Sequence, residues 1–396
     1  MRIGIYGGTY NPPHLGHFRA AAFAKATLQL DRVLMIPTNI SPHKQLPDHS
    51  PTPQQRLELV RLGCTQFPGL EACDIELRRE GASYTWQTVA QLKAEKPDAE
   101  LFLLMGTDML LSFHTWREPQ RIWQDATLAV LYRGDEGEIP AIQAQKEALE
   151  AQGARVELVK NPVTDISSTE VRQMLVLGCS SEFLPGAVEE YIRQHGFYGA
   201  GSRLQGLSLP QLEQVCIRLL KPSRVAHVLG CRDTAVQLAR HWGADETAAA
   251  RAALLHDITK ALDTPLQLTL GRSYGMIPED FQGENRQTLH ARTAGVVARK
   301  LFGEDEAVVS AIAAHTTGKP GMTLLDGILW LADYIEPNRS FPGVDTARNL
   351  AYEDWKKALL WGMNQTITHL QQKQQPIAPA TADTLQWLQS EERKIL

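Results

Sequence analysis

The sequence predicts two regions of different fold class, an α/β region followed by an all-helical one. Up to residue 198, short apolar runs alternate with segments of helical periodicity. Beyond residue 206 the apolar runs give way to long Ala-, Leu-, Arg- and Gln-containing helical stretches. The stretch HGFYGAGSRLQG between them is glycine-rich, as linkers often are. We therefore expect domains at 1–198 and 207–396, joined by a linker at 199–206.

The first region is expected to form a doubly wound parallel sheet, Rossmann-like in topology. The predicted strands are the apolar runs at residues 2–6, 32–36, 101–105, 127–132 and 155–159. Helices are predicted at 15–30, 52–66, 85–95, 119–124, 142–152 and 186–194. This alternation implies helices on both faces of the sheet. Ligands of such sheets bind beyond the carboxyl ends of the strands.

The second region is expected to be a bundle of helices. Helical periodicity predicts them at 208–220, 223–242, 245–255, 288–301, 304–314, 323–334, 352–372 and 380–391. No internal repeat relates the two regions.

Composition excludes several classes of function. The residues are 43% hydrophobic and 21% charged, and the formal net charge is −5, which argues against bulk binding to nucleic acid or membrane. The five cysteines form no CxxC pair and indicate no disulfide framework. No apolar run reaches the roughly 20 residues of a membrane span, and the chain starts in a predicted strand rather than a signal peptide. We expect a cytoplasmic protein. The sequence leaves its oligomeric state undecided, and a homo-oligomer is one of the alternatives.

The end of the first predicted strand carries the motif GGTYNPPHLGH. Gly7 and Gly8 allow a tight turn and close approach to a ligand, and Thr9 suits the turn. His14 and His17 lie three residues apart at the start of the next helix, where free N–H groups attract anions. These features predict a phosphate site in which the imidazoles stabilise transition-state charge. The alternative is an ordinary strand–turn–helix corner with two incidental histidines.

Two further strand ends carry polar residues. Lys44, in the sequence PHK, has a long stem and a point charge suited to a polyphosphate, unless it is a solvated surface lysine. Asp108 follows the apolar strand and suits either a ribose or a helix N-cap.

A third group of polar residues forms the sequence DISSTEVR. Ser167 or Ser168 followed by Glu170 predicts a helix start, and Arg172 adds a forked donor one turn later. Hydroxyls and free N–H groups at such a helix end can bind phosphates. The alternative is a capped helix with a surface arginine.

Together the two motifs resemble the GGTFxPPHxGH and ISSTxxR signatures of the nucleotidylyltransferase superfamily, and in particular the nicotinate mononucleotide adenylyltransferase family. The resemblance covers residue 1 to about residue 198. It implies transfer of an adenylyl group from ATP to nicotinate mononucleotide, with Mg²⁺, giving nicotinate adenine dinucleotide and pyrophosphate. By this resemblance the catalytic residues are His14, His17, Lys44 and Arg172.

The resemblance also implies the binding residues of the first region. Those for the nucleotide are Gly7, Gly8, Thr9, Asp108, Ser167, Ser168 and Thr169. Thr85, after Ser83 and Tyr84, and Trp116 resemble the nicotinate-side wall, although Trp86 stands where many relatives have an aliphatic residue. Arg133 faces the mononucleotide phosphate or is structural.

The second region places six polar residues in or beside apolar helical segments: His227, His256, Asp257, His290, His315 and Asp333. A carboxylate in apolar surroundings is costly unless it is paired or bound to metal. Convergence of these side chains from five helices would form a metal site. The alternative is that some are core histidines or caps.

The order of these residues resembles the HD phosphohydrolase superfamily. Asp257 and Lys260 fit HDxxK, and HTTG from His315 and DYIEPNR from Asp333 fit its YqeK-type branch, over about 209–372. That branch hydrolyses the dinucleoside polyphosphate diadenosine tetraphosphate to two ADP. The resemblance implies two transition-metal ions. Iron is the preferred assignment, and Mn and Zn are the alternatives.

By the same resemblance, one ion is held by His227, His256, Asp257 and Asp333. Asp257 bridges to a second ion, which is held by His290 and His315. Lys260 and Arg339 would neutralise phosphate charge, although a surface role fits Arg339 equally well.

Three alternative functions are open. The first region could adenylylate another acceptor, such as phosphopantetheine. The second could cleave another nucleotide, or it could be a regulatory nucleotide-binding module without activity.

Overall fold

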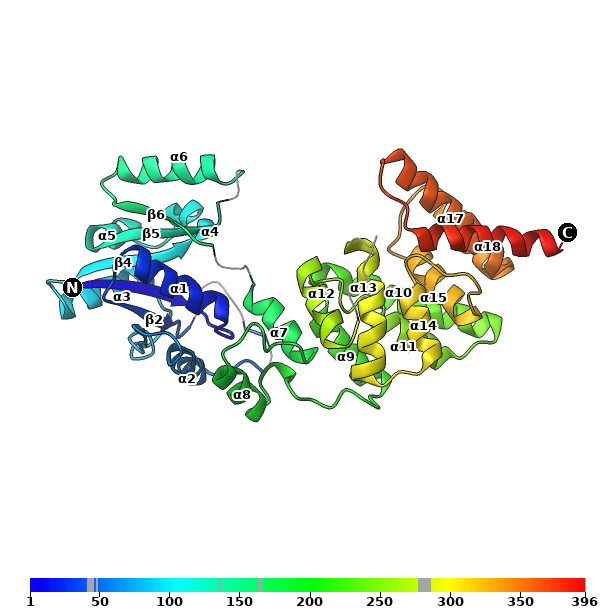
Figure 1. Ribbon diagram of the computed structural model, residues 1–396, viewed down its shortest axis with the longest axis horizontal. Coiled ribbons are helices and arrows are strands. Elements are labelled where there is room, and N and C mark those ends of the chain that lie inside the picture. Colours follow the sequence, from blue (N-terminus) through cyan, green and yellow to red (C-terminus); the bar gives the residue numbers. More distant parts are fainter. Residues whose placement is uncertain (41–45, 48, 135–136, 163–165, 277–285, 396) are drawn as a thin grey trace. The chain divides into compact units, whose positions relative to one another are not determined.

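The structure is a computed structural model that describes residues 1–40, 46–47, 49–134, 137–162, 166–276 and 286–395. It separates into two compact units, Met1–Ser202 and Arg203–Leu396. Figure 1 shows that the first contains a sheet flanked by helices and that the second is built of helices joined by loops, with no strand among its described residues. The predicted fold class, α/β followed by all-α, is confirmed.

The sheet of the first unit has six strands in the order β3-β2-β1-β4-β5-β6, and every neighbouring pair is parallel. The strands are β1 (Arg2–Gly8), β2 (Arg32–Pro37), β3 (Leu70–Ala72), β4 (Glu100–Gly106), β5 (Ala126–Tyr132) and β6 (Val156–Lys160). The chain runs outward from β1 through β2 to β3, then returns to β4 on the other side of β1. The end of β1 therefore lies at the topological switch point, where doubly wound sheets bind ligands.

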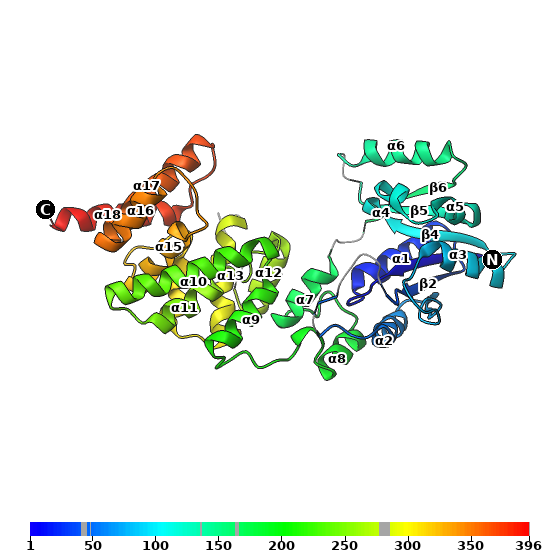
Figure 2. The same ribbon diagram turned by 180° about the vertical axis from the view of Figure 1, so that it is seen from behind.

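Helices cover both faces of this sheet. The helices of the unit are α1 (Leu15–Thr27), α2 (Pro53–Cys64), α3 (Thr85–Glu95), α4 (Thr107–Leu111), α5 (Pro119–Asp125), α6 (Ile139–Glu150), α7 (Ser168–Val176) and α8 (Gly186–Gln194), with short 3₁₀ turns at Phe113–Thr115 and Phe197–Gly199. Successive strand residues point to opposite faces. Ile3 and Ile5 pack in a core closed by α3, α5 and α6, whereas Val33 and Met35 pack in a second core closed by α1 and α2. Figure 2 gives the reverse view of these layers.

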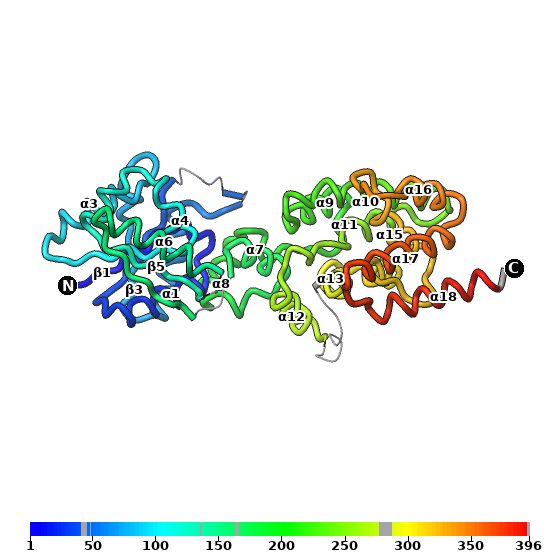
Figure 3. Tube along the Cα trace, turned by 90° about the horizontal axis from the view of Figure 1, so that it is seen from above, coloured from blue at the N-terminus to red at the C-terminus, as the bar shows by residue number. Residues whose placement is uncertain are grey.

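The described helices of the second unit are α9 (Leu209–Leu219), α10 (Pro222–Trp242), α11 (Glu246–Leu255), α12 (Thr264–Ser273), α13 (Arg286–Val297), α14 (Glu306–Ala314), α15 (Leu324–Ile335), α16 (Val344–Glu353), α17 (Trp355–Gln372) and α18 (Pro379–Ile395). A π-helical turn, Ala298–Phe302, continues α13. Figure 3 traces their succession along the chain. Among the residues that the structure describes, none of the helices is both long enough and apolar enough to cross a membrane.

Small side chains let α11 sit in the middle of this bundle. Its alanines are buried, among them Ala249, Ala250, Ala252 and Ala253, and α11 packs against α10, α14 and α15. Asp245 caps its first turn by accepting hydrogen bonds from the main-chain N–H groups of residues 247 and 248. The carboxyl end of α11 therefore delivers the next residues into the centre of the unit.

Some element predictions differ from the structure. β3, α4, α12 and α16 were not expected, and the helix predicted at 352–372 begins at Trp355 instead. The break falls at Asp354, which has extended backbone and caps α17 by accepting hydrogen bonds from the N–H groups of Lys356 and Lys357. A side-chain cap of this kind competes with continued helix.

Candidate functional sites

The first site forms where β1 ends and α1 begins. His14 is the N-cap of α1 and is 5% exposed, and His17 lies in the first turn of the helix. The centres of their rings are 3.7 Å apart. The Tyr10 ring meets His17 edge to face at 5.1 Å, so that the pair is held between β1 and α1. The motif predicted from the sequence thus forms a compact corner.

Both histidines of this corner are neutral in the free protein. Burial and the adjacent His17 ring lower the pKa of His14 to about 2, and burial lowers the pKa of His17 to about 4. The main-chain N–H of His14 donates a hydrogen bond of 3.3 Å to Nδ1 of His17. An accepting Nδ1 carries no proton, so the neutral His17 ring carries its proton on Nε2. His17 therefore presents a donor, which suits an anionic ligand.

The second sequence motif meets the first at this corner. Ser168 Oγ donates to the carbonyl of Pro12 at 2.9 Å, and Arg172 donates to the carbonyl of Asn11 at 2.6 Å. Arg172 also donates to Thr169 Oγ1 at 2.9 Å. The loop between β1 and α1 is therefore fixed by the first turns of α7, and the free N–H groups of two helices are brought to one place.

The start of α7 is a capping box. Ser167 accepts a hydrogen bond from the Glu170 N–H, and the Glu170 carboxylate accepts one from the N–H of Ser167. The predicted helix start is thus observed, and Ser168 and Thr169 occupy its first turn.

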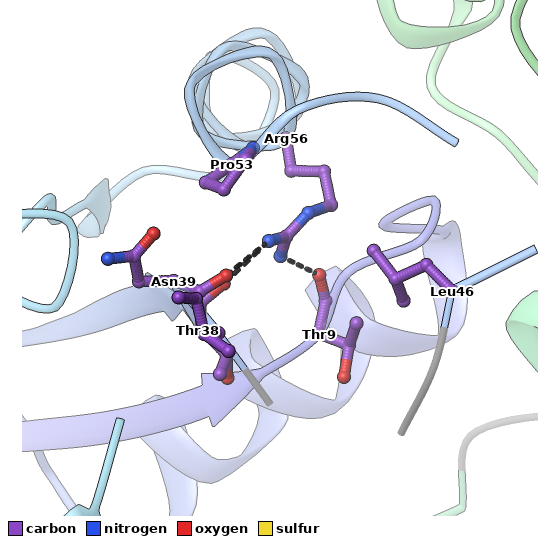
Figure 4. A pocket seen from close by; sticks show the side chains of 7 residues that line it. Thr9, Thr38, Asn39, Leu46, Pro53 and Arg56 are labelled. Carbon is purple, nitrogen blue, oxygen red and sulfur yellow. Dashed lines mark hydrogen bonds between the residues drawn. The ribbon is translucent and has the colours of Figure 1, made fainter. Parts of the chain in front are cut away.

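Arg56 was not identified from the sequence. This side chain of α2 is 1% exposed and donates to three carbonyls, those of Thr9 at 2.5 Å, Thr38 at 2.6 Å and Asn39 at 3.2 Å. Figure 4 shows it bridging the ends of β1 and β2 beside a cavity of about 220 Å³, which Leu46 and Pro53 also line. The signal available in the sequence was a charged residue among the positions of α2 that face the core.

Other predicted residues of the first unit lie on neighbouring segments. Asp108 is exposed in the first turn of α4, directly after β4, and Thr85 is the first residue of α3. Trp116 is half-buried and packs on Phe113 with ring centres 5.1 Å apart. Arg133 is exposed after β5. Gly7 and Gly8 are the last residues of β1, and Lys44 lies outside the described residues.

Trp86, the position where this chain differs from the family pattern, lies on α3 directly after Thr85. Arg121 stacks over its ring at 4.1 Å, and Arg117 stacks over the Tyr84 ring at 4.7 Å. The aromatic side chains of this region are therefore fixed by arginines from the neighbouring segment and not by aliphatic packing alone.

The second site lies at the centre of the helical unit, around Asp257. Its carboxylate is fully buried, with Oδ1 3.2 Å from His290 Nε2 and 3.8 Å from His315 Nε2. Oδ2 lies 3.5 Å from His256 Nε2 and 3.8 Å from His227 Nε2. The six residues predicted from the sequence are thus brought together from α10, α13, α14, α15 and the end of α11.

Asp333 completes the cluster from α15. Its Oδ1 lies 3.0 Å from His227 Nε2. The cluster contains two sets of potential ligand atoms, and within each set all atoms lie within 4.8 Å of one another. One set comes from His227, His256 and Asp333, and the other from His256, Asp257 and His315.

The Nδ1 atoms fix which nitrogen of each ring faces the cluster. His256 Nδ1 donates to the carbonyl of Ala253 at 2.6 Å, and His315 Nδ1 donates to that of Ile312 at 2.7 Å. His227 Nδ1 lies 3.1 Å from a carboxylate oxygen of Glu336. Because the proton is on Nδ1, Nε2 presents a lone pair, as metal-binding histidines do.

Two tests show that this cluster fits a cation. The Nε2 atoms of His227 and His256 are buried and make no hydrogen bond within the described residues. His227 Nε2 also faces an Asp333 oxygen at 3.0 Å, and with the ring proton on Nδ1 both atoms are acceptors, which a shared cation would satisfy. The donor set of imidazoles and carboxylates suits Fe, Mn or Zn.

The protonation states agree with ligation. Burial lowers the pKa of His256 and of His315, which keeps the rings neutral. Burial opposes ionisation of Asp257 and Asp333, but the surrounding histidines and cations hold both pKa values well below the usual range.

Three cations surround the two aspartates. Lys260 Nζ lies 3.2 Å from Asp257 Oδ1, Arg339 lies 2.6 Å from Asp333 Oδ1, and Arg224 contacts Asp257 Oδ2. Arg224 and Glu336 were missed from the sequence. Each lies three residues from a predicted residue, His227 and Asp333 respectively, which places it on the same helical face or at the helix end.

Comparison with known proteins assigns each unit a different relationship. Residues 5–174 match the model of the cytidylyltransferase-like family, and residues 224–338 match that of the HD domain. A probable nicotinate-nucleotide adenylyltransferase of Shewanella baltica (strain OS223) is 39% identical over 217 residues, which cover 50% of this chain and 99% of that protein. One of Desulfatibacillum aliphaticivorans is 36% identical over 219 residues, covering 50% of this chain and all of that protein (100%).

Among solved structures, a predicted HD superfamily hydrolase involved in NAD metabolism, from Clostridium acetobutylicum, is 36% identical. The match covers 47% of this chain and 98% of that chain, with a TM-score of 0.44.

Proposed function

Since the chain belongs, through its first half, to the nicotinate-nucleotide adenylyltransferase family, we propose that this half transfers the adenylyl group of ATP to nicotinate mononucleotide. The observation that carries the proposal is the corner at the start of α1, where the His14–His17 pair follows a loop that Ser168 and Arg172 of α7 hold by hydrogen bonds. Such a corner gathers N–H donors and imidazoles around one point, as the binding of a triphosphate requires.

The reaction is an in-line displacement. A phosphate oxygen of nicotinate mononucleotide forms a bond to the α-phosphorus of ATP, and the bond to the β-phosphate oxygen breaks to release pyrophosphate. Two anions must be aligned and the growing charge neutralised. His14 and His17 would stabilise the α-phosphate, with the Nε2–H of His17 as donor. Mg²⁺ would supply further neutralisation of the phosphate charge when bound.

The remaining residues would bind the two substrates. Arg172 and Lys44 would neutralise the leaving pyrophosphate. The ATP contacts would come from Gly7, Gly8, Thr9, Asp108, Ser167, Ser168 and Thr169. Thr85 and Trp116 would bind the nicotinate ring, and Arg133 the mononucleotide phosphate.

A substrate panel tests the proposal. The full chain is incubated with ATP, Mg²⁺ and one acceptor, either nicotinate mononucleotide, nicotinamide mononucleotide or phosphopantetheine. Formation of nicotinate adenine dinucleotide and pyrophosphate, with the highest kcat/KM for the first acceptor, supports it. Preference for phosphopantetheine would refute it.

For the second unit we propose a metal-dependent phosphohydrolase that splits diadenosine tetraphosphate into two ADP. The supporting observation is the pair of facing acceptors, His227 Nε2 and Asp333 Oδ1, in a buried histidine cluster. His227, His256, Asp257 and Asp333 would hold one ion, with Asp257 shared by a second ion on His290 and His315. Bound divalent ions supply an acidified water and neutralise phosphoryl oxygens.

The protein groups around the cluster would orient the substrate. Lys260 and Arg339 reach the two aspartates from partly exposed positions and would neutralise phosphates.

Chromatography of the products from metal-stripped full chain, reloaded with Fe²⁺ or Mn²⁺, tests the activity. ADP as the sole product supports symmetrical cleavage. Formation of AMP and ATP would contradict symmetrical cleavage, and cleavage of a different nucleotide would contradict the proposed substrate. Metal binding without hydrolysis would favour a regulatory module.

We propose that the two activities belong to domains at 1–198 and 207–396, with 199–206 as the linker. The boundary between the compact units, after Ser202, falls inside this proposed linker. Assay of both reactions in the full chain with one site inactivated at a time tests whether the activities separate in this way.

A further inference from the structure

The cations around the second site differ in how firmly they are held. Arg224, Lys260 and Arg339 are each partly exposed, with 27%, 31% and 34% of the side chain accessible. Arg339 has a second anchor, because its Nε donates to the main-chain carbonyl of Asp333 at 2.8 Å. Arg224 has none: within the described residues its guanidinium bonds only to Asp257, and its buried Nε makes no hydrogen bond.

Arg224 contacts the part of Asp257 that a cation would need. It donates to Oδ2, the oxygen that lies 3.5 Å from His256 Nε2 and 3.8 Å from His227 Nε2. A divalent ion coordinated by these two imidazoles would draw on the same carboxylate. The guanidinium and the ion therefore compete for Asp257.

The charges of the site point the same way. Three carboxylates (Asp257, Asp333 and Glu336) face three cations (Arg224, Lys260 and Arg339), so these ion pairs balance without metal. Divalent ions added to the cluster leave a positive excess, which a polyphosphate can neutralise. A guanidinium displaced from Asp257 is well suited to that anion, because its forked donors match phosphate geometry.

We propose that Arg224 is a phosphate-binding residue of the second site that is paired with Asp257 in the metal-free protein and released from it by metal binding. The proposal rests on the metal-dependent hydrolase proposed above and adds a coupling to it. Metal binding and polyphosphate binding assist one another, because each ligand favours the state in which the guanidinium has left Asp257.

The experiment separates this role from that of a purely structural ion pair by the sign of the effect on metal affinity. Metal-stripped full chain is titrated calorimetrically with Mn²⁺, and the Mn²⁺-loaded chain with inorganic tripolyphosphate. Arg224→Gln removes the competing cation, so Mn²⁺ should bind about threefold to tenfold more tightly. Tripolyphosphate should bind the loaded variant about tenfold more weakly, the loss of one charged hydrogen bond.

Three variants serve as controls. Arg240→Gln, on the same helix but paired with exposed Glu246, should leave both affinities unchanged. Arg224→Lys should retain part of the tripolyphosphate affinity, because the charge remains. Asp257→Asn, which keeps the shape of the side chain, defines the binding that belongs to the first unit.

Mn²⁺ affinity that is unchanged or weaker in Arg224→Gln would overturn the proposal, and weaker binding with a lower Tm would identify a structural pair. If the wild-type chain binds no more Mn²⁺ than Asp257→Asn does, the hydrolase assignment itself fails. The two failures are therefore distinguishable.

Discussion

Histidines lie at the candidate site of both units, but the ring nitrogens that they present there have opposite hydrogen-bonding roles. In the first unit, His17 Nδ1 accepts the His14 N–H, so its outward nitrogen is a donor. In the second, the Nδ1 atoms of His256 and His315 donate to carbonyls, so the inward nitrogens are acceptors. One type of side chain thus presents a donor, which suits an anion, in one fold and an acceptor, which suits a cation, in the other, according to the partner of its second nitrogen.

The charge around the rings follows the same division. No carboxylate contacts the His14–His17 pair among the described residues, whereas the buried Asp257 and the partly exposed Asp333 lie against the rings of the second cluster. In the functions proposed above, backbone N–H groups at helix ends would do in the first unit what the metal would do in the second, because both can neutralise phosphate.

The strongest test of this contrast is Asp257→Asn. Removal of the central charge should abolish metal binding and hydrolysis together, while adenylyl transfer is retained. Metal analysis of the purified chain and assays of both reactions measure this. Full metal content in the variant would count against the ligand assignment, and loss of both activities would show that the sites depend on one another.

His17→Ala tests the donor role in the first unit. We expect kcat to fall about 100-fold, with KM for ATP changed much less, because the contact strengthens in the transition state. Steady-state kinetics measures this, with exposed His195→Ala as the matched control. His17→Gln, which keeps an N–H donor, should retain more activity than His17→Ala. Equal kcat in wild type and His17→Ala would refute the role.

Glu336→Gln tests the acceptor role in the second unit. The Glu336 carboxylate lies 3.1 Å from His227 Nδ1 and is almost fully buried. Loss of its charge should weaken metal binding about tenfold or more, because the opposite nitrogen becomes less basic. Titration with Mn²⁺ measures this, against exposed Glu353→Gln as control. An unchanged affinity would mean that His227 is oriented by packing alone.

The pH dependence of stability should show the neutral state of the first pair. The pKa values of His14 and His17 are about 2 and about 4, below the unfolded value near 6.5. The unfolded chain therefore binds more protons, and stability is lost as the pH falls from about 6.5 towards 4. Each such histidine contributes a slope of about 1.4 kcal/mol per pH unit.

Denaturant unfolding of wild type and His17→Gln between pH 7 and pH 4.5 measures the difference between the two slopes. The variant should lose stability less steeply on acidification, because one titrating group has been removed. Parallel curves would show that His17 does not titrate in this range.

Much of the architecture could be predicted because local pattern and tertiary role agree. The buried runs of β1, β2, β4 and β5 are apolar in the sequence, β6 alternates buried and exposed residues, and all five pair as parallel strands. β3 was missed because Leu70–Ala72 is a three-residue strand with an exposed central residue. The division at Asp354 was missed because the apolar periodicity runs through it, and only the side-chain cap shows the break.

The sites divide along similar lines. Histidines and an HD pair in apolar helices are visible in the sequence, and they lie together in the structure. Arg56, Arg224 and Glu336 were not recognised, because each depends on a partner far along the chain. Their sign of charge is evident from the sequence, but their geometry exists only in the folded unit.

The hydrogen bonds that join α7 to the loop after β1 have a consequence for biosynthesis. Arg172 bonds to a carbonyl made 161 residues earlier, and Tyr198 bonds to the Asn11 side chain across 187 residues. At a ribosomal rate of about 5–20 residues per second, the nascent loop must wait roughly 8–32 s for Arg172. Throughout that interval the emerging polypeptide carries the histidine corner without the segment that closes it, so the first candidate site is completed only late in the translation of its own unit.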